Sequence, residues 1–355
     1  MSAIAGASGQ NRCVWEAGSQ RAPWADLCRV VAIYGVILIH SCGAMFYSFG
    51  KVPLLDWLAA NALDSVARVS VPLFVMLSGA MLLKPGVSIV MPSTLLRRIS
   101  KLLVPLLVWS FFYLFRTAIN HGEPINWLGP LRQPAAYHLW FAYMILGIYF
   151  LLPFLQAIYE GIRGRPVLIF YFLTVWAVIT SIPLYFPVPL FKVMQQTTFL
   201  GFGGYFVLGG LLADAREGRI PTIAWVGVYV ACTVATFLLT WHFSEKAGVP
   251  CETAYVYFTL NVMIASLAAF KAFTRVTTGP TVGDVLHWIS DRSALIFFVH
   301  VLVLEQVRYS AVIASLSQVL PTFFVILTIS VATFVFSLLI AATIRLIPGA
   351  SRVAG

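Results

Sequence analysis

Arg29 and His40 are ionisable residues inside one long apolar segment, and ten residues separate them. An ionisable side chain within a membrane-spanning helix is costly and marks a functional site by default. Eleven helical steps of ~100° make about three full turns, so both side chains lie on one helix face, roughly 16 Å apart along its axis. An imidazole there can accept a proton or an acyl group. A guanidinium can bind a phosphate or a carboxylate.

Purely structural roles are the alternative for both residues. Arg29 could extend to a lipid phosphate at the membrane surface, and His40 could form a hydrogen bond that holds two helices together. The depth of His40 in its segment favours a functional role, whereas both interpretations of Arg29 stay open.

The overall composition predicts an integral membrane protein. The chain has 355 residues, of which 60% are hydrophobic and 10% are charged, and its mean hydropathy is +0.89. A soluble domain contains about 25% charged residues, so this composition excludes a soluble enzyme or a nucleic-acid-binding protein. We expect an all-α polytopic membrane protein with a single domain at 24–348, between a polar cytoplasmic tail at 1–23 and a short cytoplasmic tail at 349–355.

About ten segments of the chain are apolar over the ~20 residues that a helix needs to cross a bilayer. The expected bounds are 27–49, 56–83, 102–120, 137–159, 167–186, 196–214, 223–242, 255–273, 292–314 and 322–347. We expect the second to begin as a tilted or interfacial turn around Asp56 to Asp64, and His287 to be solvated in an inner loop from Asp284 to Asp291. The polar tail lacks the apolar core of a signal peptide, so we expect no cleavage.

The basic residues predict the orientation. With both termini placed in the cytoplasm, 16 of the 23 Lys and Arg residues fall on the inner side and 7 on the outer side. The positive-inside rule therefore predicts cytoplasmic termini. This topology, with contacts to anionic lipid headgroups, accounts for the net charge of +10 without a nucleic-acid partner. The five cysteines lack metal-ligand spacing, so we expect no metal site.

Several further residues are secondary candidates. His138 and Trp140 open the fourth segment, where they could orient a sugar or belong to the ordinary interfacial belt. His300 and Glu305 lie within the ninth segment and could form a polar network with His40, or simply hold helices together. Three outer basic residues could steer an anionic glycan-lipid or merely contact lipid: Arg116, Arg132 and Arg308.

Five motifs follow one another along the chain. They are WADLCRVVAIYGVILIH (Trp24 to His40), VPLFVMLSGAMLL with its Ser78-Gly79 pair (Val71 to Leu83), LLRRISKLLVPLLVW (Leu95 to Trp109), HLWFAYMILGIYFLLP (His138 to Pro153) and SALIFFVH (Ser293 to His300). In this order they resemble the acyltransferase-3 family of integral membrane acyltransferases, in which an Arg and a His separated by ten residues are the hallmark pair. The Leu-Trp-Phe run after His138, with GYFVLGGLL at Gly204 to Leu212, is similar to the branch that includes the enterobacterial-common-antigen O-acetyltransferase.

The resemblance implies transfer of an acyl group, commonly acetyl, from cytoplasmic acyl-CoA to a hydroxyl of a cell-envelope polysaccharide or glycolipid. The protein would be a multi-pass enzyme of the bacterial inner membrane, with His40 and Arg29 as its catalytic residues. General-base catalysis by His40 is favoured over an acyl-histidine intermediate. Acetyl-CoA would be a substrate, with no bound cofactor.

The expected partners are acyl-CoA, an envelope glycan or lipid-linked saccharide, and membrane lipids. A cationic cluster could hold the coenzyme A phosphates, or could serve topology alone; its members are Arg97, Arg98 and Lys101. Ser78 joins His138, Trp140, His300 and Glu305 as a candidate for acceptor binding or for a polar network.

A polysaccharide or lipid-linked glycan transporter or flippase is the main alternative, because it would also combine about ten helices with a few buried charges. Many transporters contain paired, interrupted helices in two related halves, and the sequence has no detectable internal repeat. A non-catalytic membrane scaffold is a further alternative, but it would not need a histidine aligned with an inner cationic cluster.

Overall fold

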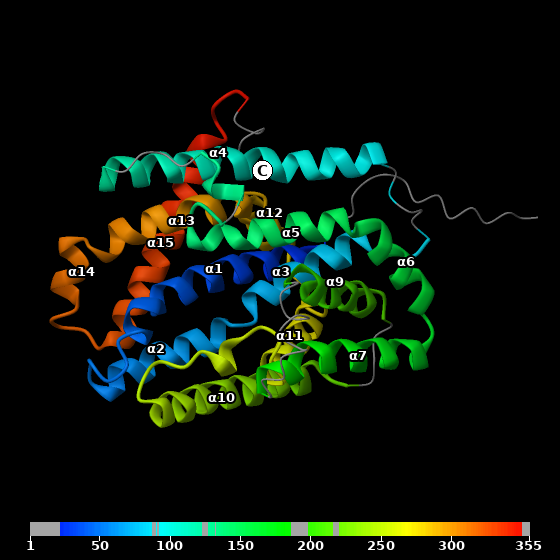
Figure 1. Ribbon diagram of the computed structural model, residues 1–355, viewed down its shortest axis with the longest axis horizontal. Coiled ribbons are helices and arrows are strands. Elements are labelled where there is room, and N and C mark those ends of the chain that lie inside the picture. Colours follow the sequence, from blue (N-terminus) through cyan, green and yellow to red (C-terminus); the bar gives the residue numbers. More distant parts are fainter. Residues whose placement is uncertain are drawn as a thin grey trace, which may run out of the picture.

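The computed structural model describes residues 22–86, 90, 92–122, 127–131, 133–185, 198–215 and 220–349, and within these ranges it contains helices, turns and loops but no strand. Most of the long helices run side by side along the longest axis of the molecule (Figure 1). They are α1 (Pro23–Phe46), α2 (Leu54–Ala67), α3 (Ser70–Leu82), α4 (Pro92–His121), α5 (Trp140–Phe150), α6 (Leu152–Ile162), α7 (Pro166–Tyr185), α9 (Thr198–Asp214), α10 (Thr222–Ala247), α11 (Leu260–Phe273), α12 (Pro280–Ser290), α13 (Ser293–Arg308), α14 (Ala311–Leu316) and α15 (Thr322–Ile344). Short 3₁₀ helices are η1 (Gly129–Leu131), η2 (Tyr137–Leu139) and η3 (Thr253–Tyr255).

The predicted class, a helical polytopic membrane protein, is confirmed, but the count of ten spans is not. Six helical segments of the described chain are long and apolar enough to cross a membrane, or up to eight if each of two bent pairs counts as one span. Two predicted spans are not counted because their helices are too short: the apolar part of α7 is Pro166–Ser181, and α9 has 17 residues. The predicted spans 167–186 and 196–214 extend outside the described residues, as do most of both predicted tails.

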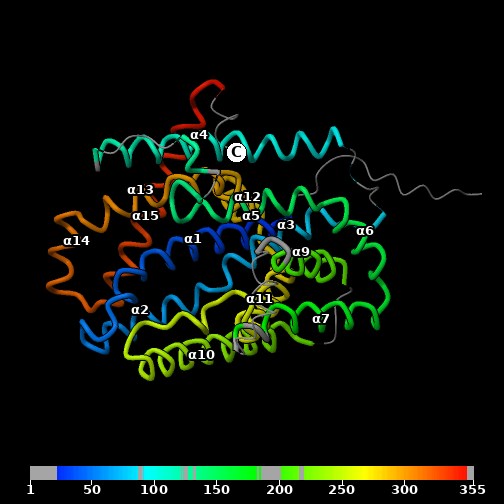
Figure 2. The backbone as a smooth tube through the Cα atoms, viewed as in Figure 1, coloured from blue at the N-terminus to red at the C-terminus, as the bar shows by residue number. Residues whose placement is uncertain are grey.

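Helix α1 is at the centre of the bundle. It packs against α2, α3, α11, α12, α13 and α15, and Figures 1 and 2 show it crossing the middle of the molecule. Pro23 occupies its first turn, where a missing N–H costs no hydrogen bond. Asp26 in the same turn complements the positive end of the helix dipole. Because α1 is buried on several sides, many helices can contribute side chains around Arg29 and His40.

The second predicted span is one apolar segment of 29 residues, Leu54–Leu82, but its helix is interrupted at Arg68 and Val69. From Asp56 to Asp64, where a tilted or interfacial turn is expected, α2 is regular helix. The break occurs where the chain crosses α1 closely: a Cβ on Gly35 would lie 2.0 Å from Ser70 Oγ. The Tyr229 hydroxyl donates to the Val66 carbonyl at 2.8 Å, so a backbone acceptor near the break is satisfied.

Helices α3 and α9 cross at unusually short distance. A Cβ on Gly79 would lie 1.8 Å from the Phe206 carbonyl oxygen, and one on Gly209 would lie 1.9 Å from the Met76 carbonyl oxygen. Small residues allow such close approach of helix backbones in membranes. The crossing therefore fixes α3, the helix that contains Ser78.

Two helix pairs bend sharply. The axes of α5 and α6 differ by 64° across Leu151, and those of α12 and α13 differ by 60°. The predicted inner loop at 284–291 is therefore wrong, since α12 is helical through Ser290. His287 of α12 lies 3.1 Å from Asp26 of α1, with its side chain half exposed. This contact docks α12 against the first turn of α1.

Candidate active site

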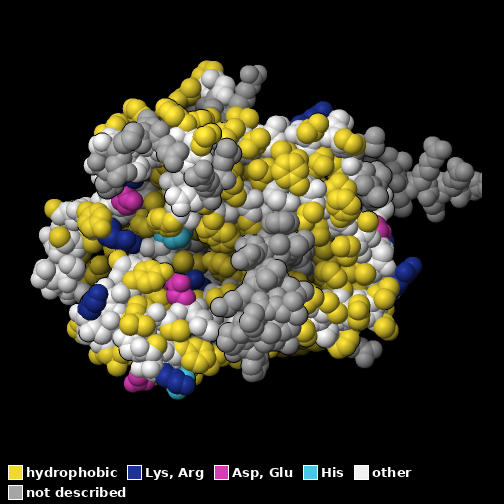
Figure 3. All heavy atoms as spheres, in the orientation of Figure 1, with side chains coloured by type: hydrophobic (Ala, Val, Ile, Leu, Met, Phe, Trp, Pro, Cys, Tyr) yellow, Lys and Arg dark blue, Asp and Glu magenta, His cyan; other side chains and the backbone are white. Residues whose placement is uncertain are grey.

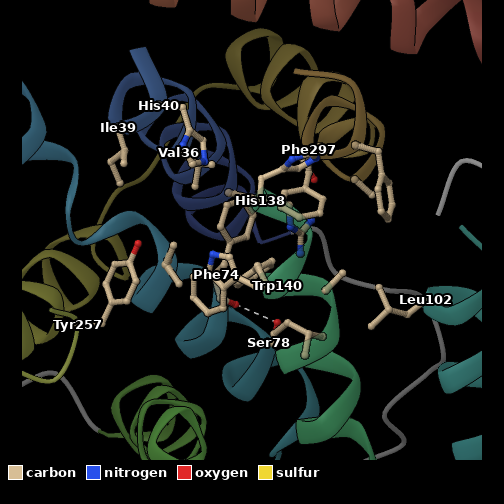
Figure 4. A pocket seen from close by; sticks show the side chains of 18 of the residues that line it. Val36, Ile39, His40, Phe74, Ser78, Leu102, His138, Trp140, Tyr257 and Phe297 are labelled. Atoms are coloured by element: carbon tan, nitrogen blue, oxygen red, sulfur yellow. Dashed lines mark hydrogen bonds between the residues drawn. The ribbon is translucent and has the colours of Figure 1, made fainter. Parts of the chain in front are cut away.

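An internal cavity of about 290 Å³ lies between α1, α3, α4, α5 and α13. This volume is at the lower end of the range for small-molecule sites. Figure 4 shows His40, Ser78, His138, Trp140 and Tyr257 arranged around one space, with most of the remaining wall apolar. The structure thus brings five of the residues selected from sequence to a single cavity: Arg29, His40, Ser78, His138 and Trp140.

Arg29 forms part of the cavity wall and is held by two neighbours. Its Nη1 donates to Ser290 Oγ at 2.9 Å and lies 3.8 Å from Asp26 Oδ1, one turn earlier on α1. The side chain is 32% exposed. A guanidinium has five N–H donors, so these contacts leave donors for a ligand.

His40 lies further along the same uninterrupted helix, about 16 Å from Arg29 along the axis. Its ring contacts the Tyr137 ring edge-to-face, with centroids 5.0 Å apart. Its backbone carbonyl accepts a hydrogen bond from Arg308 Nη2 at 2.7 Å. Arg308 at the end of α13 is therefore tied directly to the turn of α1 that contains His40.

Three imidazoles cluster at this end of the cavity. The His300 ring stacks on that of His40 at a centroid distance of 5.4 Å and an interplanar angle of 25°. It also meets the His138 ring edge-to-face at 5.1 Å. Both His138 and His300 are almost completely buried, at 1% and 0% exposure. Within the described ranges, no group of His, Cys, Asp and Glu side chains has the arrangement of a metal site.

The buried histidines have unused hydrogen-bonding capacity. His300 Nδ1 lies 2.6 Å from the Phe297 carbonyl, so this nitrogen is the donor and Nε2 is left as a buried acceptor without a partner. Neither ring nitrogen of His138 forms a hydrogen bond of regular geometry, although the Phe298 carbonyl is close enough to interact with the ring and accepts from the Tyr113 hydroxyl at 2.8 Å. A buried polar atom without a partner costs about 1–3 kcal/mol. Such atoms beside a cavity are suited to binding a polar ligand.

Trp140 and Tyr257 form an aromatic part of the wall, with ring centroids 6.1 Å apart and planes 27° from parallel. The Ser78 hydroxyl donates to the Phe74 carbonyl at 2.9 Å, which leaves its oxygen free to accept.

Glu305 does not line the cavity. It pairs with Arg116 of α4 instead of extending the histidine cluster.

The three basic residues of the predicted cationic cluster do not share one environment. Arg97 and Lys101 are exposed on α4, whereas Arg98 is half-buried. Arg98 shares a face of α4 with Leu102, four residues later, which lines the cavity. Of the three basic residues, Arg98 is therefore the one that lies towards the cavity.

Sequence reasoning misses two residues near His40. Neither Tyr257 nor Arg68 is among the site candidates taken from the sequence, in which Arg68 is one of the seven basic residues assigned to the outer side. A signal for Arg68 is present in the sequence, because it is a charged residue inside the long apolar segment 56–83, four residues after Asp64.

The described helices therefore form a multi-pass membrane protein with a cavity that is lined in part by arginine and histidine. The comparison with family models specifies the class further: the acyltransferase domain model matches residues 22–342. The chain belongs to this family and is a membrane acyltransferase. Neither the curated proteins nor the solved structures contain a significant match.

Proposed function

We propose that this acyltransferase is an O-acetyltransferase that uses cytoplasmic acetyl-CoA to modify a hydroxyl of a cell-envelope polysaccharide or glycolipid. The observation that supports it most strongly is the single cavity that Arg29, His40 and His138 share. Because α1 is one continuous helix, an anion-binding group and a base are held at a fixed separation. Acetyl-CoA enters this proposal as a substrate, without a resident cofactor.

The proposed orientation has ten spans, both termini in the cytoplasm, and the Arg29 end facing the cytoplasm of a bacterium, in its inner membrane. The excess of basic residues on that side supports it. Arg98 would bind coenzyme A phosphate next to Arg29, while Arg97 and Lys101 would attract the polyanion from the exposed face of α4. Membership of the enterobacterial-common-antigen branch is part of this proposal and is supported by the motifs at His138 and Gly204.

In the proposed reaction, His40 takes the proton of the acceptor hydroxyl as its oxygen attacks the thioester carbonyl carbon. The C–O bond forms and the C–S bond breaks. The departing sulfur receives the proton from the His40 imidazolium, so the products are an acetyl ester and coenzyme A thiol. The imidazole returns to its neutral form, and no proton is gained or lost overall.

The other two histidines take supporting roles in this proposal. His138, which lines the cavity, would bind the acceptor next to the wall that Trp140 and Tyr257 form. His300 would hold the His40 ring by stacking. Ser78 can accept a hydrogen bond from either substrate, whereas Glu305 would fix α13 to α4.

The decisive variant is His40→Ala, with His242→Ala as the matched control because His242 is exposed on α10. We expect His40→Ala to abolish acetylation of envelope glycans while the protein still inserts, and His242→Ala to retain it. Acetyl content would be measured by NMR of purified glycans from strains expressing each variant. Normal acetylation in the His40 variant would refute the proposal. Loss of surface polymer with unchanged acetyl content would favour the transporter alternative.

A covalent route through acetyl-His40 can be separated from direct transfer. Direct transfer predicts no stable acetylation of the peptide containing His40 when purified protein meets acetyl-CoA without an acceptor. Mass spectrometry after rapid quenching would check this, and acetylation at His40 that disappears on addition of acceptor would establish the covalent route instead.

A further inference from the structure

Arg68 and Asp64 form a buried ion pair at the break between α2 and α3. Arg68 Nη2 lies 2.6 Å from Asp64 Oδ2, and the two side chains are only 12% and 2% exposed. The Tyr255 ring lies against the guanidinium, with 3.9 Å from its carbon to the ring centroid. A buried ion pair is weak evidence for stability, because desolvation opposes the attraction between the charges. Its presence within an apolar span therefore needs another explanation.

A polar network holds this pair in place. The Tyr255 hydroxyl donates to Asn61 Oδ1 at 2.5 Å, and Asn61 Nδ2 donates to the Phe237 carbonyl at 3.0 Å. Two atoms of the pair remain unpartnered although buried: Asp64 Oδ1 and Arg68 Nε. The guanidinium is thus fixed in position while its hydrogen-bonding capacity is incompletely used.

Arg68 and Arg308 lie just outside the cavity lining, Arg68 against Tyr255 and Arg308 against the carbonyl of His40. Tyr257, which lines the cavity, is close enough for its hydroxyl to interact with the Arg68 side chain. Besides the neighbouring His300 ring, the ionisable side chains that act electrostatically on the His40 ring are Arg68 and Arg308. In the described part of the chain Arg308 has no carboxylate within ion-pair distance, and it donates hydrogen bonds to the carbonyls of His40 and Ser41.

The carboxylates in this region are engaged by other partners. Glu252 accepts from the Tyr47 hydroxyl at 2.5 Å, and Glu305 pairs with Arg116. Figure 3 shows basic and acidic side chains gathered around a histidine in a recess, on the half of the molecule towards α14. The His40 ring itself contacts the Tyr137 and His300 rings, and the two basic side chains that act on it, Arg68 and Arg308, come from separate parts of the chain.

We propose that Arg68 and Arg308 bind an acidic group of the acceptor, so that the acceptor is a saccharide bearing a carboxylate or a phosphate. This inference rests on the proposed O-acetyltransferase function and specifies its substrate class. A guanidinium recognises both anions through paired N–H donors, and one held rigid by a carboxylate loses little freedom on binding. Asp64 is then a positioning residue for Arg68.

The acceptor class can be tested with glycans from the protein's own host. Envelope glycans from a strain lacking the protein would be separated by anion exchange into neutral and acidic pools. Each pool would be incubated with purified protein in proteoliposomes and radiolabelled acetyl-CoA. We expect label in the acidic pool; label confined to the neutral pool would overturn the inference but leave the acetyltransferase function standing. Label in neither pool would refute both.

Two chemical treatments distinguish the sources of the acidic group. Mild acid releases a sugar from a lipid diphosphate, and carbodiimide-assisted reduction converts sugar carboxylates to alcohols. Loss of acceptor activity after the first treatment assigns phosphate, and loss after the second assigns carboxylate. Full acceptor activity after both would overturn the inference.

The residues are tested by neutralising the pair as a unit, because Arg68→Gln alone would leave Asp64 buried without its partner. The variant Asp64→Asn with Arg68→Gln should raise the KM for the acidic acceptor about tenfold or more, the loss expected for hydrogen bonds to a charged group, with an unchanged KM for acetyl-CoA. Arg308→Gln should do the same, and Arg68→Lys should retain part of the affinity.

The matched control is Arg163→Gln with Asp214→Asn, another guanidinium–carboxylate pair at 3.4 Å, and none of the residues that contact Arg163 lines the cavity. It should leave both KM values unchanged. If the neutralised Arg68 pair and Arg308→Gln both keep the wild-type KM for the acidic acceptor, the assignment is wrong. Size-exclusion chromatography would verify folding, and Arg308→Gln tests the site independently of the buried network.

Discussion

The crossing of α3 and α9 should be among the places where one added methyl group is least tolerated. A Cβ at Gly209 would lie 1.9 Å from the Met76 carbonyl oxygen, whereas ordinary contact begins at 3.4 Å. The helices would have to separate by about 1.5 Å, the difference between these two distances. Overpacking costs about 1–3 kcal/mol, and we expect Gly209→Ala to cost about 3 kcal/mol, because the obstructing atom is helix backbone.

Gly79→Ala gives this prediction a sharper form. Its Cβ would meet the Phe206 carbonyl oxygen at 1.8 Å on the other side of the same crossing. A separation of the two helices that accommodates one methyl group also accommodates the other. The double variant should therefore be destabilised by about 3 kcal/mol, like either single variant, and the coupling energy should approach the ~3 kcal/mol limit seen for neighbouring sites.

The assay is thermal unfolding of the purified protein in detergent, followed by tryptophan fluorescence. Gly227→Ala is the control, since Gly227 lies in α10 and a Cβ added there would have nothing within 4 Å; it should be neutral or stabilising by up to ~1 kcal/mol. Equal stability of the Gly209 and Gly227 variants would refute the reasoning, as would additive losses in the double variant.

Three further predictions concern the cavity. Arg98→Ala should raise the KM for acetyl-CoA about tenfold or more, as expected for a lost charged hydrogen bond, whereas exposed Arg97→Ala should change it far less; equal effects would contradict the assignment of Arg98 to the cavity. Arg29→Ala should chiefly weaken acetyl-CoA binding, measured by calorimetry, and an unchanged donor affinity would make Arg29 structural. His138→Ala should raise the KM for the acceptor more than that for acetyl-CoA in steady-state kinetics, and the reverse order would assign His138 to the donor.

The placement of Arg29 and His40 in one cavity wall follows from helical geometry, because eleven residues return the chain to the same face. The same geometry explains why the other predicted groups separate. Arg97 and Lys101 are four residues apart and share an exposed face, while Arg98 is turned by ~100° towards the bundle. A cluster that is continuous in sequence is therefore divided between two faces of α4.

Helix rotation also separates Glu305 from the histidines. Five residues correspond to ~500°, so Glu305 is turned by about 140° from His300 on α13. His300 consequently stacks on His40, and Glu305 pairs with Arg116. The partner on α4 could not be read from one sequence, because it depends on which helices become neighbours.

The break at Arg68 is hidden from the sequence for a different reason. The hydropathy pattern predicts one continuous apolar helix at 56–83. It contains no information on the close contact between Gly35 and Ser70, which lies next to the interruption. The spacing of Asp64 and Arg68 is typical of an intrahelical pair. Their proximity to His40 and Tyr257 requires the tertiary structure, since these residues come from α1 and from the segment before α11.

Arg29 and Arg68 are each held by a carboxylate in the same way. Asp26 lies one turn before Arg29 and Asp64 one turn before Arg68, so each guanidinium is oriented by a carboxylate on its own helix. The three clustered histidines have other immediate neighbours: aromatic rings, backbone carbonyls and one another. Two anionic substrates bound at such fixed cations would have their charged groups at opposite ends and their uncharged reacting groups between them. We infer that this separation directs the thioester and the hydroxyl to the same imidazole while keeping the negative charges of the two substrates apart.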